Sequence, residues 1–185
     1  MKQLFLSLKD ELNDKLKKNI WERAVSLPDS DNKINVITGM RRTGKSYYMV
    51  GIIKDLVSSG VDFKRVAYFN FEDDRLLPMS QKSFSGLIDV FYEVSPDNHD
   101  HLCYLFFDEI QNVEGWPQVI RRVFDTKNVR IFLTGSSARM LSREIATSLR
   151  GRSINTEMWP LSFTEFPGRF RYPSEMPKKM MDQYL

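Results

Sequence analysis

The most constraining feature of the sequence is the segment over residues 39–46, GMRRTGKS, which matches the pattern G-x-x-x-x-G-K-[ST] at every fixed position. It follows a short apolar run, residues 34–38, and opens a segment with helical character over residues 45–58 that stops before Gly60. Glycines at this spacing let the backbone curl so that successive N–H groups face one phosphate, and the following helix adds its positive N-terminal end. The segment therefore predicts a strand, a phosphate-binding loop and a helix, in that order.

Two side chains of this loop have defined roles in phosphate binding. The ammonium group of Lys45 is expected to reach the β- and γ-phosphates of a nucleotide, and the hydroxyl group of Ser46 to bind Mg²⁺. Arg41 and Arg42 either add positive charge beside the phosphates or form a solvated loop tip. The residues expected to contact the nucleotide here are Gly39, Met40, Arg41, Arg42, Thr43, Gly44, Lys45, Ser46 and Tyr47.

The rest of the chain alternates between short apolar runs and segments of helical periodicity. Strands are expected over residues 34–38, 65–71, 102–107, 129–134 and 152–159. Helices are expected over residues 2–25, 45–58, 82–94, 117–125 and 138–149. This alternation predicts an α/β domain with a mostly parallel sheet.

Breaks in the pattern divide the chain into three parts. Residues 1–28 are expected to form an amphipathic helix that packs on the core and ends before Pro28. Residues 29–160 are expected to form the α/β domain. Residues 161–185 hold three prolines and no clear strand, and they are expected to begin a helical lid or linker that is truncated.

The composition is that of an ordinary globular protein. Hydrophobic residues make up 42% and charged residues 28% of the 185 residues, which excludes collagen-like, disordered and low-complexity chains. The single cysteine excludes an intramolecular disulfide framework. The net charge of +3 permits a nucleic-acid partner without arguing for one. No apolar run approaches the roughly 20 residues that span a bilayer, so we expect a cytoplasmic protein with no membrane contact.

An acidic pair follows the apolar run over residues 102–107. Asp108 and Glu109 would stand at the carboxyl edge of a parallel sheet, where ligands bind in open α/β folds. Asp108 is a candidate to hold Mg²⁺, directly or through water, and Glu109 to orient and deprotonate an attacking water. The alternative is a pair of acids that caps the next helix. Downstream of a phosphate-binding loop, the pair favours the metal-binding interpretation.

Small polar residues end the apolar run that begins at Val129. Thr134 and Ser136 are candidates to contact the γ-phosphate or the attacking water. A serine at this position could equally cap the helix expected over residues 138–149, and one residue can do both.

Several segments resemble a known group of nucleotide-hydrolysing proteins. Those that look like the Walker A, Walker B and sensor-1 elements of AAA+-like ATPases are residues 39–46, 106–109 and 133–137. Three tracts are more specific, and are similar to a family of prokaryotic ATPases with an N-terminal AAA domain and an uncharacterised C-terminal domain: residues 69–73, 134–152 and 159–166. The resemblance covers most of the chain.

The resemblance implies a three-layer P-loop NTPase fold with a five-stranded sheet in the order 5-1-4-3-2. It implies ATP and Mg²⁺ as ligands, hydrolysis coupled to a conformational change, and a C-terminal domain that would act on a protein or DNA target. In AAA+-like proteins an arginine in the region of Arg150 and Arg152 can reach the nucleotide of a neighbouring subunit. Arg150 is therefore the first candidate for a catalytic arginine finger in a homo-oligomer, and turnover without a neighbour is expected to be slow.

Two other functions would use the same loop. A nucleotide-gated interaction module with little or no hydrolysis would not need Glu109. A small-molecule kinase is less favoured, because Glu109 suits a water molecule better than a substrate hydroxyl. The chain contains no Asn-Lys-x-Asp guanine-recognition motif, which argues against a GTPase.

Three weaker clusters have a plainer interpretation. Glu72 either joins the water network around Mg²⁺ or simply ends the second strand. His99, His101 and Cys103 have metal-ligand spacing, but no second cluster completes a tetrahedral zinc site. The basic residues around Trp21 could touch nucleic acid, but we expect them to form the solvated face of the first helix.

Overall fold

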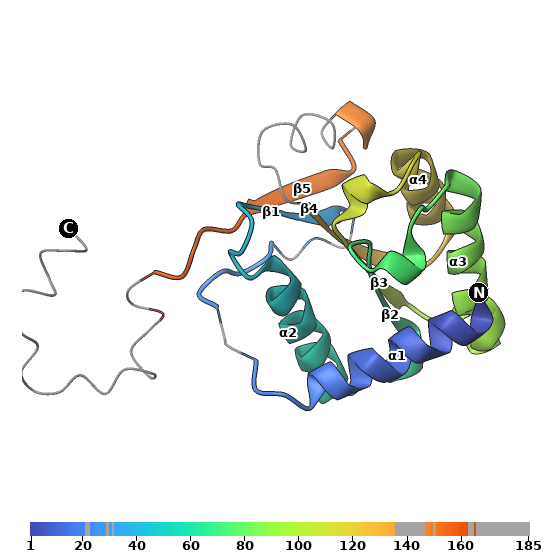
Figure 1. Cartoon of the computed structure of the whole chain (residues 1–185), viewed down its shortest axis with the longest axis horizontal. Helices are drawn as coiled ribbons and strands as arrows, with labels where there is room; N and C mark the ends of the chain where they lie inside the picture. The colour runs from blue at the N-terminus through green and yellow to red at the C-terminus, as the bar shows by residue number, and fades with distance from the viewer. Residues whose placement is uncertain are drawn as a thin grey trace, which may run out of the picture.

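The computed structural model describes residues 1–20, 23–28, 30, 32–135, 147–149, 151–162 and 165. The described helices are α1 (Lys2–Leu16), α2 (Lys45–Ser58), α3 (Gln81–Val94) and α4 (Trp116–Thr126). The described strands are β1 (Ile34–Thr38), β2 (Val66–Asn70), β3 (Cys103–Asp108), β4 (Val129–Gly135) and β5 (Ser153–Glu157). Their arrangement is shown in Figure 1.

The five strands form one parallel sheet in the order β2-β3-β4-β1-β5. At its centre Val36 of β1 lies opposite Leu133 of β4 on one side and Asn155 of β5 on the other. The order confirms the one implied by the resemblance, 5-1-4-3-2. Because all strands run in the same direction, the loops that follow β1, β3 and β4 leave the sheet at one edge, where ligands bind in such folds.

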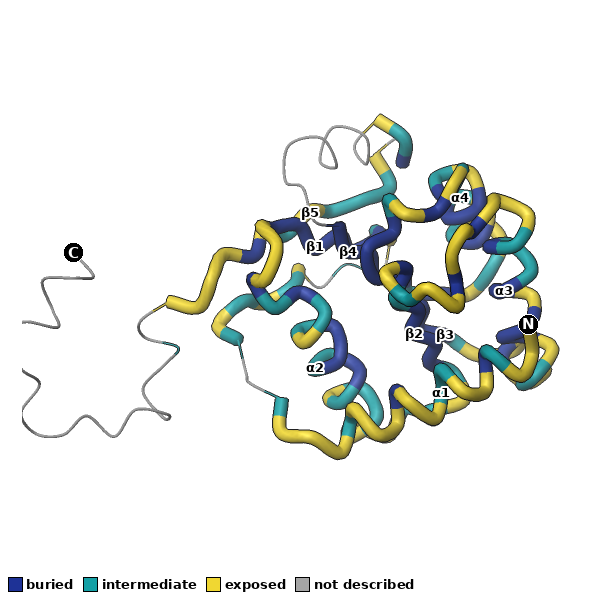
Figure 2. Tube along the Cα trace, in the orientation of Figure 1, coloured by how far each residue is buried: buried dark blue, intermediate teal, exposed yellow. Residues whose placement is uncertain are grey.

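Helices cover both faces of the sheet, which makes the three layers of a P-loop NTPase fold (Figure 1). Strand β3 shows why both faces must be covered. Leu105 and Phe107 belong to the core that contains α3 and α4, whereas Tyr104 and Phe106 belong to the core that contains α2. A strand buried on both faces appears in the sequence as a continuous apolar run. In Figure 2, β1, β2, β3 and β4 are almost entirely buried, whereas the edge strand β5 is only partly buried.

Helix α1 packs across the edge of the sheet that ends in β2 (Figure 1). Its Phe5 belongs to the core with α3 and α4, and its Leu12 belongs to the core with α2. Glu11 of this helix also pairs with Arg75, in the loop after β2, at 2.6 Å. An edge strand presents unpaired backbone groups to other chains, so a helix in this position protects it.

Helix α1 is shorter than the sequence predicts. It ends at Leu16 instead of near residue 25, and residues 17–20 and 23–28 are not helical. Ile20 and Val25 nevertheless pack against the core beside α2. The apolar spacing that suggested a longer helix therefore reflects burial of a non-helical segment, and periodicity alone does not distinguish the two.

The other described helices and strands begin and end within two residues of the predicted positions. The helix expected over residues 138–149 and the lid or linker expected over residues 161–185 fall largely outside the described residues, so both stay predictions, as do the three domain boundaries. None of the described helices combines the length and the hydropathy needed to cross a membrane.

Candidate nucleotide-binding site

The loop between β1 and α2 depends on residues with unusual backbone geometry. An ideal Cβ atom at Gly39 would lie 2.2 Å from the carbonyl oxygen of Met158, so no side chain fits between the loop and the segment after β5. Gly44 precedes α2 in the left-handed conformation, with φ 89°. Arg42 also has a positive φ, 66°, which costs a non-glycine residue about 1–3 kcal/mol. Left-handed residues in such a loop turn backbone N–H groups into a concave anion site.

Lys45 begins α2 and folds back over the loop. Its Nζ donates to the carbonyl oxygens of Gly39 at 3.0 Å and Met40 at 2.9 Å, and the residue is only 4% exposed. Among the described residues no carboxylate pairs with this ammonium group. A positive charge held by carbonyl oxygens alone is well suited to a phosphate, because a charge-assisted hydrogen bond is about twice as strong as a neutral one.

Asp108 ends β3 and is completely buried. The hydroxyl group of Tyr68, from β2, donates to its Oδ2 at 2.8 Å, and the hydroxyl group of Thr134, from β4, donates to its Oδ1. Burial, together with the charge of Asp108, raises the pKa of Tyr68 well above its usual range, so Tyr68 remains a proton donor. Strands on both sides of β3 thus hold this carboxylate in place.

Glu109 follows at once and leaves the line of the strand. Its backbone is left-handed, with φ 54°, and the residue is 7% exposed. The Glu109 N–H donates to Thr134 Oγ1 at 2.9 Å, and Gln111 Nε2 donates to Glu109 Oε2 at 2.5 Å. Thr134 therefore links the two acids, since it accepts from the Glu109 amide and donates to Asp108. Its expected contact with a γ-phosphate or an attacking water stays a prediction.

Three residues of this region are not singled out by the sequence. Tyr68 could have been proposed once the strand order was assumed, because β2 lies beside β3 and Asn70 is opposite Asp108. Gln111 lies two residues after Glu109, but no sequence pattern marks it. Arg23 is one of the basic residues around Trp21 that are expected on a helix face, whereas it donates to the Thr43 carbonyl oxygen of the phosphate loop.

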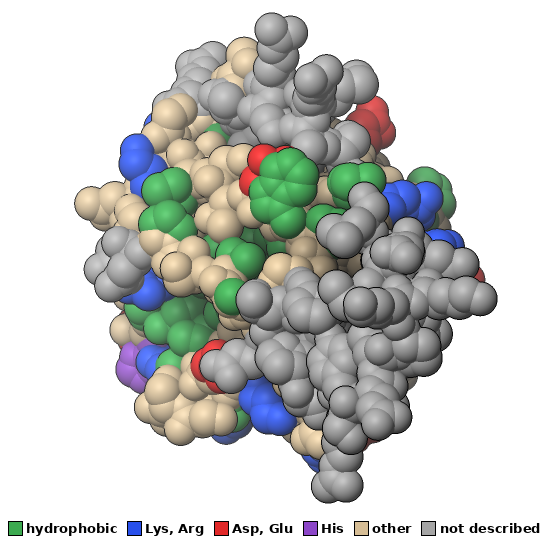
Figure 3. All heavy atoms as spheres, turned by 90° about the vertical axis from the view of Figure 1, so that its left-hand side faces the viewer, with side chains coloured by type: hydrophobic (Ala, Val, Ile, Leu, Met, Phe, Trp, Pro, Cys, Tyr) green, Lys and Arg blue, Asp and Glu red, His purple; other side chains and the backbone are tan. Residues whose placement is uncertain are grey.

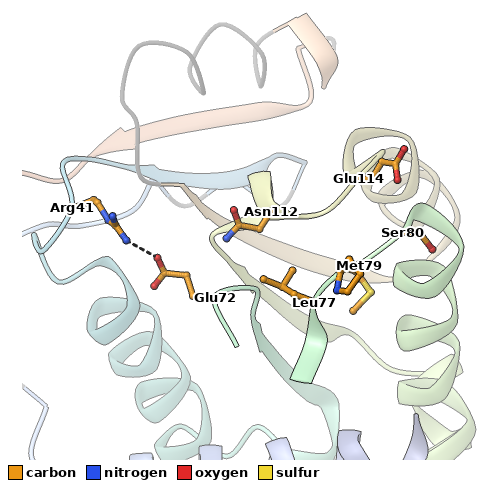
Figure 4. A pocket seen from close by; sticks show the side chains of 8 residues that line it. Arg41, Glu72, Leu77, Met79, Ser80, Asn112 and Glu114 are labelled. Atoms are coloured by element: carbon orange, nitrogen blue, oxygen red, sulfur yellow. Dashed lines mark hydrogen bonds and ion pairs between the residues drawn. The ribbon is translucent and has the colours of Figure 1, made fainter. Parts of the chain in front are cut away.

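An open pocket of about 1100 Å³ lies beside the loop (Figure 4). Arg41 reaches it from the loop and pairs with Glu72 at 3.2 Å. Both side chains are at least half exposed, so this pair contributes little to stability. The other lining residues are Leu77, Pro78, Met79, Ser80, Asn112 and Glu114. The pocket adjoins the phosphate loop, and Lys45 and Ser46 do not line it.

Some predicted site residues lie elsewhere or are not described. Ser136 and Arg150 fall outside the described residues, so their roles stay predictions. Arg152 forms a two-pronged pair with Asp125 of α4, at 2.8 Å and 3.1 Å, and is thus engaged within its own chain. In the part of the chain that the structure describes, no three His, Cys, Asp or Glu side chains converge to hold a metal ion.

Comparison with known proteins identifies the family. A family model described as an AAA domain matches residues 31–167, well over half of the chain. The chain belongs to this AAA-domain family. The strand order of the sheet and the geometry of the loop before α2 agree with an AAA+-like P-loop fold.

Two uncharacterised proteins are clear relatives of this AAA domain. One, from Methanocaldococcus jannaschii, is 40% identical over 157 residues, which cover 85% of this chain and 33% of the relative. The other, from Haemophilus influenzae, is 34% identical over 151 residues, which cover 81% of this chain and 36% of the relative. The chain thus spans about a third of the length of the curated relatives it matches.

Solved structures with a similar fold are more distant. DnaA from Aquifex aeolicus is 16% identical with a TM-score of 0.49, over 95% of this chain and 54% of that chain. PCH-2 from C. elegans is 17% identical with a TM-score of 0.46, over 86% of this chain and 42% of that chain. At these identities the similarity concerns the fold alone.

Proposed function

We propose that this AAA domain binds ATP with Mg²⁺ and hydrolyses it, and that hydrolysis drives a conformational change. The observation that carries the proposal lies at one edge of the sheet: a Lys45 ammonium group that pairs with no carboxylate of the described residues, and the linked acids Asp108 and Glu109. Binding alone would need the lysine, but it would not need Glu109.

The loop would hold the phosphates. Lys45 would exchange its carbonyl partners, Gly39 and Met40, for phosphate oxygens, while the N–H groups over residues 39–46 donate to the same phosphates. Tyr47 is 72% exposed in the first turn of α2 and is available for the contact predicted for it. Arg42 and Thr43 would contribute through their backbone.

The residues fit a magnesium ion between the loop and the acids. Ser46 follows Lys45 in the first turn of α2, and Asp108 stands at the same edge of the sheet. When bound, Mg²⁺ would neutralise charge on the β- and γ-phosphate oxygens. Because each Asp108 oxygen already accepts a hydrogen bond from a hydroxyl group, we propose that Asp108 holds the metal through water.

Glu109 would orient and deprotonate the water that attacks the γ-phosphate. In the present conformation the amide of Gln111 occupies its Oε2 at 2.5 Å. Glu109 must therefore share or lose this partner before it can act as a base. The same contact favours the second candidate function, a nucleotide-gated interaction module in which hydrolysis is slow or absent.

The wider role belongs to the same proposal. An arginine finger from Arg150 would act in a homo-oligomer, and a protein or DNA target would be reached through a further domain. A cytoplasmic location is likewise an expectation from the sequence.

The test is ATP turnover with Mg²⁺, measured against protein concentration for the wild type, Lys45→Ala and Glu109→Gln. Lys54→Ala and Glu93→Gln, which change a half-buried and an exposed residue outside the site, serve as matched controls. We expect Glu109→Gln to lower turnover by roughly 10²–10⁴-fold and to keep ATP binding. Lys45→Ala should lose both.

The outcomes separate the candidates. Turnover per molecule that rises with protein concentration would support a finger supplied by a neighbouring subunit. ATP binding without turnover at any concentration would favour the gated module. A wild-type protein that binds no ATP would contradict both.

A further inference from the structure

One arginine fastens the segment before β1 to the phosphate loop. Arg23 donates to the Thr43 carbonyl oxygen at 2.6 Å, to the Trp159 carbonyl oxygen at 2.8 Å and to Glu165 Oε1 at 2.9 Å. Its side chain is only 6% exposed. A single guanidinium group thus joins three parts of the chain. They are the segment before β1 (residues 23–28), the phosphate loop (residues 39–46) and the segment after β5 (residues 158–162 and 165).

Glu165 is held as firmly as its partner. Its Oε1 also accepts from the Ala24 amide at 3.0 Å, and its Oε2 accepts from the amide and the hydroxyl group of Ser162 at 2.7 Å and 3.0 Å. The hydrogen bond from Arg23, with those from the Ser162 and Ala24 amides, lowers the pKa of Glu165 to about 2. The carboxylate is therefore ionised near neutral pH.

The segment after β5 contacts both ends of the loop. At the first end, the Met158 amide donates to the Thr38 carbonyl oxygen at 2.7 Å, and the Met158 carbonyl oxygen leaves no room for a Cβ atom at Gly39. At the second end, a Cβ atom at Gly44 would meet the terminal methyl carbon of Met158 at 3.9 Å and the Arg23 guanidinium group at 3.5 Å. In Figure 1 the loop and this segment lie together at the left of the molecule.

The face that carries these two segments also exposes hydrophobic side chains (Figure 3). The exposed large hydrophobic residues of the loop, the first turn of α2 and the segment after β5 are Met40, Tyr47, Trp159 and Leu161.

The ion pair between Arg23 and Glu165, in contrast, is almost completely covered. A charged pair removed from water is costly unless its polar atoms are hydrogen-bonded. Here each guanidinium nitrogen of Arg23 donates to an oxygen, and both carboxylate oxygens of Glu165 accept from N–H groups.

The bond to Thr43 also orients the next peptide group. In a planar trans peptide the carbonyl group and the following N–H point in opposite directions. By holding the Thr43 carbonyl oxygen, Arg23 therefore also sets the direction of the Gly44 N–H. The Gly44 and Lys45 amides stand where the loop meets α2, among the donors that phosphate-binding loops use.

We propose that Arg23 and Glu165 are positioning residues for the phosphate loop, and that through them a bound nucleotide and the segment after β5 stabilise each other. The proposal rests on the nucleotide binding proposed above. A loop that is ordered in advance loses less entropy on binding. Linkage is reciprocal, so an anchor that strengthens nucleotide binding must itself be strengthened by the nucleotide.

The first test measures the dissociation constant for ATP with Mg²⁺ in Arg23→Met, Glu165→Gln and the double variant. Arg75→Met and Glu11→Gln are matched controls. Arg75 also pairs with two carboxylates, those of Glu11 on α1 and Asp73 after β2, but it does not contact the phosphate loop. We expect each substitution in the anchor to weaken binding roughly tenfold. The double variant should bind no worse than Arg23→Met, because the two residues act as one unit.

The second test measures amide hydrogen exchange. A general loss of stability would speed exchange throughout the protein, whereas loss of the anchor should speed it at the phosphate loop. In the nucleotide-free protein, exchange at Gly44 and Lys45 should be faster in both anchor variants than in the controls. In the wild type, ATP should slow exchange at Ala24 and Ser162, and this slowing should vanish in Arg23→Met. Arg23→Lys replaces Arg23→Met if the latter does not fold, since one ammonium group cannot reach all three acceptors.

Unchanged ATP affinity and unchanged loop exchange in folded variants would overturn the proposal. Additive losses in the double variant would show that the two residues act independently, against a shared anchor. A wild-type protein that binds no ATP would refute the proposed function and, with it, the link to the nucleotide. Exchange at Gly44 and Lys45 would then still decide whether the pair positions the loop.

Discussion

Asp108 carries a carboxylate into the interior of the sheet, where an unpaired charge would be strongly unfavourable. Two hydroxyl groups stabilise the charge by donating hydrogen bonds to it, one from each neighbouring strand: Tyr68 on β2 and Thr134 on β4. The same two groups restrict the orientation of the carboxylate. At the scale of the residue, the orientation of the Asp108 carboxylate thus depends on the hydroxyl groups of Tyr68 and Thr134, which are not expected to bind the metal themselves.

Tyr68→Phe should lower the free energy of unfolding by about 1.5–3 kcal/mol, because it removes a hydrogen bond to a buried charged group. Tyr92→Phe is the matched control. The Tyr92 hydroxyl is also buried, but it has no hydrogen-bond partner among the described residues, so its removal should be neutral or slightly stabilising. Urea denaturation of both variants checks the difference. Equal losses of stability in the two would contradict the importance of the bond to Asp108.

At the scale of the element, helix α1 stands out because it joins the two cores that the sheet separates. Phe5 contacts the rings of Phe69 and Phe91 on one side, with centroids 6.0 Å and 6.3 Å apart. Leu12, two turns later, packs on the side of α2. The helix therefore stabilises the sheet as well as protecting its edge strand.

Phe5→Ala should destabilise the protein by about 3–5 kcal/mol, the usual cost of removing a fully buried ring. Leu6→Ala changes the next residue of the same helix, which is 43% exposed, and should change stability by no more than about 0.5 kcal/mol. Chemical denaturation of both variants would measure these changes in the free energy of unfolding. A small effect of Phe5→Ala would mean that α1 is not part of the cooperative core.

At the scale of the whole molecule, the ion pair of Arg23 and Glu165 joins segments that are 142 residues apart in the sequence. It joins these segments at the phosphate loop, since Arg23 also donates to the Thr43 carbonyl oxygen of the loop and to the Trp159 carbonyl oxygen after β5. The charge state of one carboxylate therefore affects how distant parts of the chain are held together.

This pair predicts a particular dependence of stability on pH. The pKa of Glu165 is lowered to about 2 in the folded protein, whereas a glutamate in an unfolded chain titrates near about 4.3. The stabilisation is therefore complete above the unfolded pKa and is lost as the pH falls from about 4.3 toward 2. Melting temperatures of the wild type and Glu165→Gln should differ most near neutral pH and converge in acid.

Glu93→Gln is the control for this experiment, because Glu93 is exposed and forms only a 3.8 Å pair with Lys2. Its curve should follow that of the wild type. If the melting curves of Glu165→Gln and the wild type stayed parallel down to pH 2, the buried pair would not contribute in the way the structure indicates.

Much of this arrangement could be predicted from the sequence, because it depends on neighbours along the chain. The apolar runs, the glycines at positions 39 and 44 and the start of α2 at Lys45 are local features, and local backbone geometry follows from them. The acids at the end of β3 could be placed for the same reason. The strand order came from the family resemblance, and the length of α1 was overestimated because a buried non-helical segment has the same apolar spacing.

What the sequence by itself determined is therefore the phosphate loop and the described strands and helices, apart from the length of α1, each specified by residues a few positions apart. Only the tertiary structure decided which side chains complete the site. Tyr68 reaches Asp108 across 40 residues of sequence, and Arg23 reaches Glu165 across 142. The first contact exists because a crossover connection brings the parallel strands β2 and β3 side by side. Neither contact leaves a trace in the local sequence pattern.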